Sequence, residues 1–243
     1  MKTFRDLNPR NKISVVLLYA RMNLRVVFGL KALFCLAATA VYFAIFYAIV
    51  ASSGESLTVV EVLAWLVWLP TTIFAVLFSM EIISQEQDAG VLEAFFTVSV
   101  SPYRLWTIKI ATLLLGVCVL ALALIALTDQ YVFDLPVALT LAYVFPPLLF
   151  FAGLTMLFSA MFKSANAAGL CAVAILAFVM LTAEGLSTTV VYPYLNPFER
   201  PMGTEPFIWV RTVVYNKIAY TLLGCVWFWR ALRWLDRRER LLK

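Results

Sequence analysis

The stretch EIISQEQDAGVLEAFFTVSVSPYRLW (residues 81–106) separates two long apolar runs and is rich in carboxylates. Of the 243 residues in the chain, 63% are hydrophobic and 14% charged, whereas a typical soluble domain has about 25% charged residues. This composition predicts an integral membrane protein, in which the stretch connects two spans outside the membrane. The carboxylates are those of Glu81, Glu86, Asp88 and Glu93.

Apolar runs on both sides of this loop predict the rest of the fold. A helix needs about 20 mainly apolar residues to cross a bilayer. We expect an all-α protein with six transmembrane helices in a single domain, 1–243, made of a cytoplasmic or interfacial segment (1–27), a six-helix bundle (28–232) and a basic tail (233–243). The windows lie at roughly 28–52, 57–80, 104–127, 136–161, 166–186 and 208–232.

The basic residues predict the orientation of this bundle. Cytoplasmic loops carry an excess of Lys and Arg, and all but three of the nineteen Lys and Arg residues fall on one side of the six-span plan. The exceptions are Arg200, Arg211 and Lys217. We therefore expect a multi-pass protein of the inner (cytoplasmic) membrane, with both termini and the acidic stretch in the cytoplasm.

Two interpretations of the N-terminal segment NKISVVLLYARMNLRVV (residues 11–27) remain open. Its basic residues form a narrow wedge on an otherwise apolar surface, which is typical of a helix that lies on the membrane. Alternatively, the segment extends the first span inward.

The second half of the acidic stretch predicts a docking element. VLEAFFT, from Val91, is compatible with a short helix that Asp88 or Gly90 caps. An exposed helix with two adjacent phenylalanines usually has a partner. The alternative is a solvated acidic loop.

The chain resembles the permease subunits of the type-2 class of ATP-binding cassette (ABC) transporters. The resemblance lies in an acidic residue at the end of the second span, the pattern E-x-x-x-G-x-L-E, a Ser-Pro pair and a Lys early in the third span. It extends to the six-span plan, the basic tail and the segment YLNPFERP (194–201) before the last span. The matching positions are Glu81, Glu86, Gly90, Leu92, Glu93, Ser101, Pro102 and Lys109.

This resemblance implies that the acidic stretch is a cytoplasmic coupling helix between spans two and three. It would sit in a groove of a separate ABC ATPase subunit, and two permease chains, the second a copy or a homologue, would join two ATPases in an exporter of hydrophobic or amphipathic molecules. The chain has no G-x-x-x-x-G-K-[ST] motif, so the partner would bind ATP and Mg. The implied coupling residues are Glu81, Glu86, Asp88, Gly90, Leu92, Glu93, Phe95 and Phe96.

Charged residues inside apolar spans suggest a second site. Glu61, Glu184 and Lys217 lie within predicted spans, where charge is costly and often functional. Glu184 and Lys217 could form an ion pair or line a pathway. The alternative function is therefore an ion-coupled secondary carrier or a channel that uses these three residues.

The resemblance also implies short external re-entrant helices between spans five and six, which cap the outer end of the pathway. Asn196, Pro197 and Glu199 are the cap residues in this interpretation. The stretch around them is rich in proline and aromatic residues, which indicates a stiff segment.

Several classes of function are not expected. The chain contains no histidine, which excludes Ser-His and Cys-His nucleophile pairs and H-E-x-x-H zinc sites. We expect no catalysis, no metal site and no cofactor in this chain, and no nucleic-acid partner.

Overall fold

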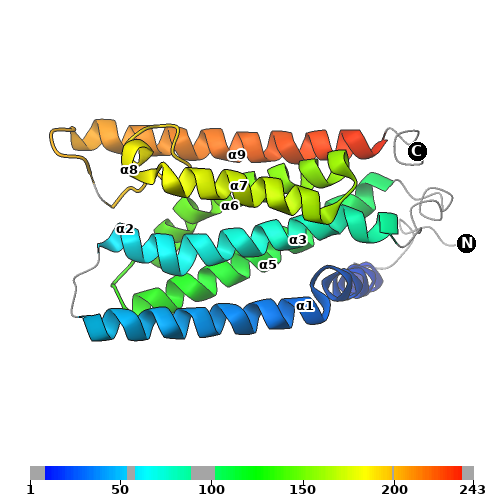
Figure 1. Ribbon diagram of the computed structural model, residues 1–243. Helices are drawn as coiled ribbons and strands as arrows, with labels where there is room; N and C mark the ends of the chain where they lie inside the picture. Colours follow the sequence, from blue (N-terminus) through cyan, green and yellow to red (C-terminus); the bar gives the residue numbers. More distant parts are fainter. Residues whose placement is uncertain (1–8, 54–57, 89–101, 199, 237–243) are drawn as a thin grey trace, which may run out of the picture.

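The protein is seen here in a computed structural model that describes residues 9–53, 58–88, 102–198 and 200–236. The elements of these residues are all helical. Six long helical segments run back and forth along one direction (Figure 1). They are α1 (Pro9–Ser53), the continuous series α2 (Val59–Val62), η2 (Leu63–Trp68) and α3 (Leu69–Asp88), then α5 (Pro102–Tyr131), α6 (Val137–Phe162), α7 (Ala165–Leu181) and α9 (Pro206–Asp236), with the short α8 (Ala183–Leu186) between the last two.

Because successive long helices run in opposite directions, the bundle has two distinct ends (Figure 1). α1 begins and α9 ends at the same end of the bundle (Figure 1), which we call the terminal end; α3 ends and α5 begins there. The other end, which we call the distal end, holds the start of α2, α8, and the irregular segment 187–205 that leads into α9.

Four helical stretches are long and apolar enough to cross a membrane, so the prediction of an all-α membrane protein is confirmed at this level. Each begins and ends within a few residues of a predicted window. α7 has 17 residues and would be about 26 Å long, slightly shorter than the roughly 30 Å hydrocarbon core. The four stretches are Phe28–Ser52, Val59–Ile83, Trp106–Tyr131 and Val137–Phe162.

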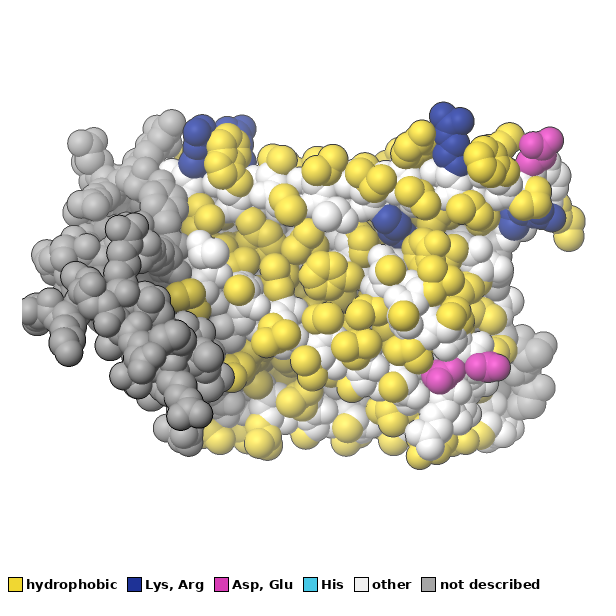
Figure 2. Space-filling model, turned by 180° about the vertical axis from the view of Figure 1, so that it is seen from behind, with side chains coloured by type: hydrophobic (Ala, Val, Ile, Leu, Met, Phe, Trp, Pro, Cys, Tyr) yellow, Lys and Arg dark blue, Asp and Glu magenta, His cyan; other side chains and the backbone are white. Residues whose placement is uncertain are grey.

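The surface supports the same interpretation. In Figure 2 hydrophobic side chains cover most of the middle of the visible face, whereas most of the charged side chains lie toward its two ends. This distribution suits a bundle whose middle contacts lipid and whose ends contact water.

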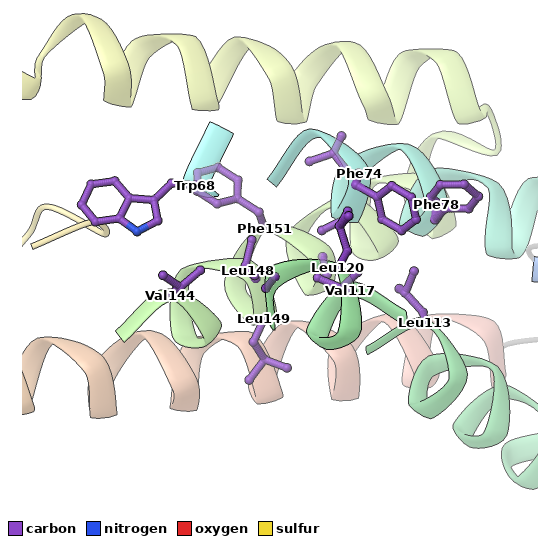
Figure 3. Packing of buried hydrophobic residues seen from close by; sticks show 14 of the residues in the cluster. Trp68, Phe74, Phe78, Leu113, Val117, Leu120, Val144, Leu148, Leu149 and Phe151 are labelled. Carbon is purple, nitrogen blue, oxygen red and sulfur yellow. The ribbon is translucent and has the colours of Figure 1, made fainter. Parts of the chain in front are cut away.

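α6 lies at the centre of the bundle, where it packs against α3, α5, α7 and α9. Many of its buried hydrophobic residues belong to one large hydrophobic cluster (Figure 3). Helices that are apolar on all sides are typical of a core element or a membrane span. The cluster includes Trp68, Phe74 and Phe78 from η2 and α3, Leu113, Val117 and Leu120 from α5, and Val144, Leu148, Leu149 and Phe151 from α6.

Two glycines allow α6 and α9 to approach closely. A Cβ atom at Gly153 would lie 2.8 Å from the carbonyl oxygen of Gly224, and a Cβ at Gly224 would lie 2.9 Å from the carbonyl carbon of Leu149. Real Cβ atoms almost never come so near backbone atoms. Small residues at a crossing point replace side-chain contacts with backbone packing, as in many membrane bundles.

α1 is bent and lies at the edge of the bundle. Gly29 has φ 39° and ψ −156°, which interrupts the helix, and Figure 1 shows the segment before it turned across the direction of the rest of α1. Only 6% of the residues in the apolar window of α1 are buried, compared with 72% for Val59–Ile83. The helix therefore presents most of its apolar surface outward.

The π-helix η2 ends beside a proline. The N–H of Leu69 donates to the carbonyl of Ala64, five residues back. The same pattern would pair the Trp65 carbonyl with residue 70, but Pro70 has no N–H. The hydroxyl of Tyr42 on α1 donates to that carbonyl at 3.0 Å instead.

Candidate functional site

The most elaborate polar arrangement in the described residues lies at the distal end, where segment 187–205 folds back into the bundle. Tyr194 is fully buried. Its ring stacks on Trp68, with centroids 5.0 Å apart, and lies parallel to Phe151 at 6.2 Å. Its hydroxyl forms a 2.7 Å hydrogen bond with the hydroxyl of Thr72. Tyr194 therefore anchors the segment between α3 and α6.

Side chains on one face of α9 donate hydrogen bonds to backbone carbonyls of the residues just before Tyr194. The Nδ2 of Asn216 donates to the carbonyls of Val190 at 2.6 Å and Tyr192 at 2.9 Å, and the hydroxyl of Tyr220 donates to the carbonyl of Val191. Backbone outside regular structure must still pair its polar groups when buried. We call this set, completed by Lys217, the α9 clamp.

Lys217 belongs to this clamp. Its side chain is 7% exposed and its Nζ donates to the carbonyl of Pro193 at 3.0 Å. The sequence suggested Glu184 as its partner. Glu184 lies in α8, and its side chain is outside the described residues. The interaction that the structure shows for Lys217 is structural, because it pairs a backbone carbonyl in the buried segment.

Glu61, which the sequence suggested as a pathway residue, instead caps the start of a helix. Its Oε2 accepts hydrogen bonds from the N–H of Thr58 at 2.9 Å and from the Thr58 hydroxyl at 3.0 Å. The Thr58 hydroxyl in turn accepts from the Glu61 N–H at 3.3 Å. This is a capping box at the start of α2, and Glu61 is exposed.

The predicted external cap is described in part. Asn196 is 6% exposed, and its Oδ1 accepts from the N–H of Phe198 at 2.9 Å, which forms a tight turn around the half-buried Pro197. Glu199 lies outside the described residues.

The predicted coupling residues fall mostly outside the described part of the chain. Glu81 forms an ion pair with Lys31 of α1, with 2.7 Å between Oε1 and Nζ. Glu86 and Asp88 lie in the last turns of α3, where the side chains are not described. Gly90, Leu92, Glu93, Phe95 and Phe96 lie in the undescribed segment 89–101.

A cleft of about 210 Å³ opens beside the buried segment at the distal end. Burial raises the pKa of Tyr192 and of Tyr194 above the usual value of 10.0, so both rings carry neutral hydroxyls at physiological pH. The walls include Thr188, Tyr192, Tyr194, Asn196, Arg200 and Trp209.

Sequence reasoning missed Asn216 and Tyr220, although a signal was present. Together with Lys217, which it did single out, these polar residues recur within about one helical turn of the predicted span 208–232. Tyr220 follows Lys217 by three positions and Asn216 by four, and residues at these two spacings are neighbours on the helix surface. Such a polar strip inside a span indicates an internal partner.

Comparison of the chain with protein-family models, with curated proteins and with solved structures gave no match.

Proposed function

We propose that this chain is the membrane-spanning permease subunit of a type-2 ABC transporter. In this proposal all six long helices cross the inner membrane, with the terminal end in the cytoplasm and the distal end outside. The segment of α1 before Gly29 lies on the inner membrane surface, and residues around Asn196 form the re-entrant cap.

One topological observation carries the proposal. α3 ends and α5 begins at the terminal end, so the acidic stretch connects two helices on the side where α1 begins and α9 ends. A coupling helix must lie on that side, because the basic residues that favour the cytoplasm flank the same end. The resemblance in residues 81–109 supplies the rest of the argument.

The roles of the residues follow from this arrangement. The carboxylates of the coupling element would pair with basic groups on the ATPase, which sets orientation and association rate more than affinity. Phe95 and Phe96 would supply the buried contact. ATP hydrolysis in the partner would then drive export of a hydrophobic or amphipathic molecule by a pair of permeases.

The structure gives less support to an ion-coupled carrier or channel. That function would need Glu61 and Lys217 to face a pathway, whereas Glu61 caps a helix and Lys217 binds the Pro193 carbonyl. Both observed roles are structural.

Affinity purification of the tagged chain from membranes of its own cells tests the proposal. We expect a nucleotide-hydrolysing subunit to copurify with the wild-type chain and with the control Glu205→Lys, an exposed position at the distal end. Glu86→Lys should lose that subunit while still inserting in the membrane. Recovery of the ATPase with Glu86→Lys, or its absence from the wild-type sample, would contradict the proposal.

A further inference from the structure

Two residues that line the distal cleft carry hydrogen-bond donors that the described part of the protein leaves unused. The Nδ2 of Asn196 and the Nε1 of Trp209 are buried and have no hydrogen-bond partner in the described part of the protein. The two side chains are 6% and 5% exposed, and both residues line the cleft. Buried polar groups are nearly always paired, so two unpaired donors around one cavity indicate a ligand.

The hydrogen bonds already made in the cleft determine what kind of ligand it suits. The Oδ1 of Asn196 already accepts from the N–H of Phe198, whereas the Nδ2 of the same amide donates to no group in the described part of the protein. The indole of Trp209 can only donate. Arg200 adds an exposed guanidinium with several N–H groups at the same cleft.

The charge of the cleft agrees with these donors. Its described lining residues include Arg200 but no Asp or Glu, so an anion would meet attraction and a cation would not. Charge-assisted hydrogen bonds from Arg and from N–H groups to an oxyanion are among the strongest in proteins.

We propose that the distal cleft binds the oxyanion group of a small ligand, a phosphate or a carboxylate, through Asn196, Trp209 and Arg200. The volume of about 210 Å³ is below the roughly 300–1,000 Å³ of pockets for drug-sized molecules. It therefore accommodates a free anion or a lipid headgroup, and not a whole lipid.

The surroundings offer a place for acyl chains if a lipid carries the oxyanion. Phe207, Ile208 and Val210 flank Trp209 along α9 and are 76%, 51% and 54% exposed. A headgroup in the cleft would leave its chains free to cover this apolar surface. The proposal stands independently of an ATPase partner, since the cleft is formed by this chain alone.

Titration of the purified protein in detergent micelles tests the site. The probes are inorganic phosphate, dioleoyl phosphatidylglycerol and, as a neutral control, dioleoylglycerol, and the readout is the shift in unfolding temperature with probe concentration. Saturable stabilisation by both phosphate and phosphatidylglycerol identifies a general oxyanion site. Stabilisation by phosphatidylglycerol alone identifies a headgroup site.

Three variants separate the site from unspecific charge effects. Asn196→Asp keeps an oxygen for the Phe198 N–H but replaces the donor with a negative charge, and Arg200→Gln removes the guanidinium; we expect each to weaken binding by roughly tenfold or more. Arg211→Gln removes a charge from an exposed position on α9 outside the cleft lining, and binding should not change.

The experiment tests the proposal even if Asn196→Asp fails to fold. Arg200 is exposed, so Arg200→Gln should fold, and size-exclusion chromatography should show the same elution volume as for the wild-type chain. The proposal is overturned if neither anionic probe stabilises the wild-type protein. It is also overturned if Arg200→Gln binds as tightly as Arg211→Gln, or if dioleoylglycerol stabilises as well as the anionic lipid.

Discussion

The hydroxyl of Tyr42 donates a 3.0 Å hydrogen bond to the backbone carbonyl of Trp65, and so joins the peripheral helix α1 to the π-helix η2. Pro70 creates the need for this bond, since it cannot supply the N–H that would otherwise meet the carbonyl. π-helical turns are rare and occur often at functional sites. Here the turn also provides a side-chain attachment for a helix that has few other buried contacts.

Removal of this hydroxyl should loosen α1. We expect Tyr42→Phe to lower the free energy of unfolding in detergent by about 1 kcal/mol, the usual net value of one hydrogen bond. Pro70→Ala restores an N–H at position 70, so in that background Tyr42→Phe should cost less. A double-mutant cycle by denaturant titration measures the coupling; equal costs in both backgrounds would show that Pro70 does not create the need for the bond.

The crossing of α6 and α9 should not tolerate a methyl group. We expect Gly224→Ala to destabilise the protein by about 1–3 kcal/mol, the range for overpacked cores, because its Cβ would meet the Leu149 backbone at 2.9 Å. Gly185→Ala is the matched control, since nothing lies within 4 Å of its Cβ position. Thermal unfolding of both variants checks this, and equal stability would refute the close approach.

The α9 clamp should control the order of the segment before Tyr194. In Asn216→Leu the carbonyls of Val190 and Tyr192 lose their donor, and we expect backbone amides at Tyr192 and Leu195 to exchange hydrogen roughly tenfold faster. Thr212→Val removes a polar group from α9 that bonds only within the helix, so exchange there should not change. Hydrogen-exchange mass spectrometry distinguishes the two; unchanged exchange in Asn216→Leu would show that the clamp does not order the segment.

Alkaline pH should destabilise the bundle through Tyr194. Burial raises the pKa of this tyrosine above 10.0, so near pH 10 the unfolded chain releases a proton that the folded chain retains. The stability contribution is fully present below pH 10 and is lost as the pH rises further, with a limiting slope of about 1.4 kcal/mol per pH unit. The unfolding temperature of Tyr194→Phe should fall less steeply than that of the wild type between about pH 10 and 11. Parallel curves would contradict this assignment.

Apolar length was the part of the fold that the sequence could predict. The window 28–52 matches Phe28–Ser52, and 136–161 matches Val137–Phe162, because a span is recognised by its hydropathy and extent. The boundary at the acidic stretch was predicted less closely, because α3 continues to Asp88, beyond the predicted window 57–80, and α5 begins at Pro102.

Packing within the bundle was not predictable in the same way. On α5, Leu113 and Val117 are buried, whereas Leu115 and Val119 are 62% and 58% exposed. The same residue types face the core and the outside, since lipid and protein interior are equally apolar. The sequence therefore contains little information about which face of each helix turns inward.

The sequence singled out two residues of the distal end but not their contacts. The resemblance named Asn196 as a cap residue and Lys217 is a charge inside a predicted span, whereas their partners in the structure are backbone groups of Phe198 and Pro193. Backbone carbonyls have no sequence signature. Only the fold of segment 187–205 brings them to α9, and this fold depends on the burial of Tyr194.

The break at Gly29 divides α1 into two parts, of which the second has a length that suits the hydrocarbon core of a bilayer. A straight helix of the 45 residues in α1 would measure about 68 Å, more than twice the hydrocarbon thickness of a bilayer. After the glycine, about 36 Å of helix remains, which matches its neighbours. The position of this one glycine thus determines how many residues of α1 run along the bundle and how many turn away from it.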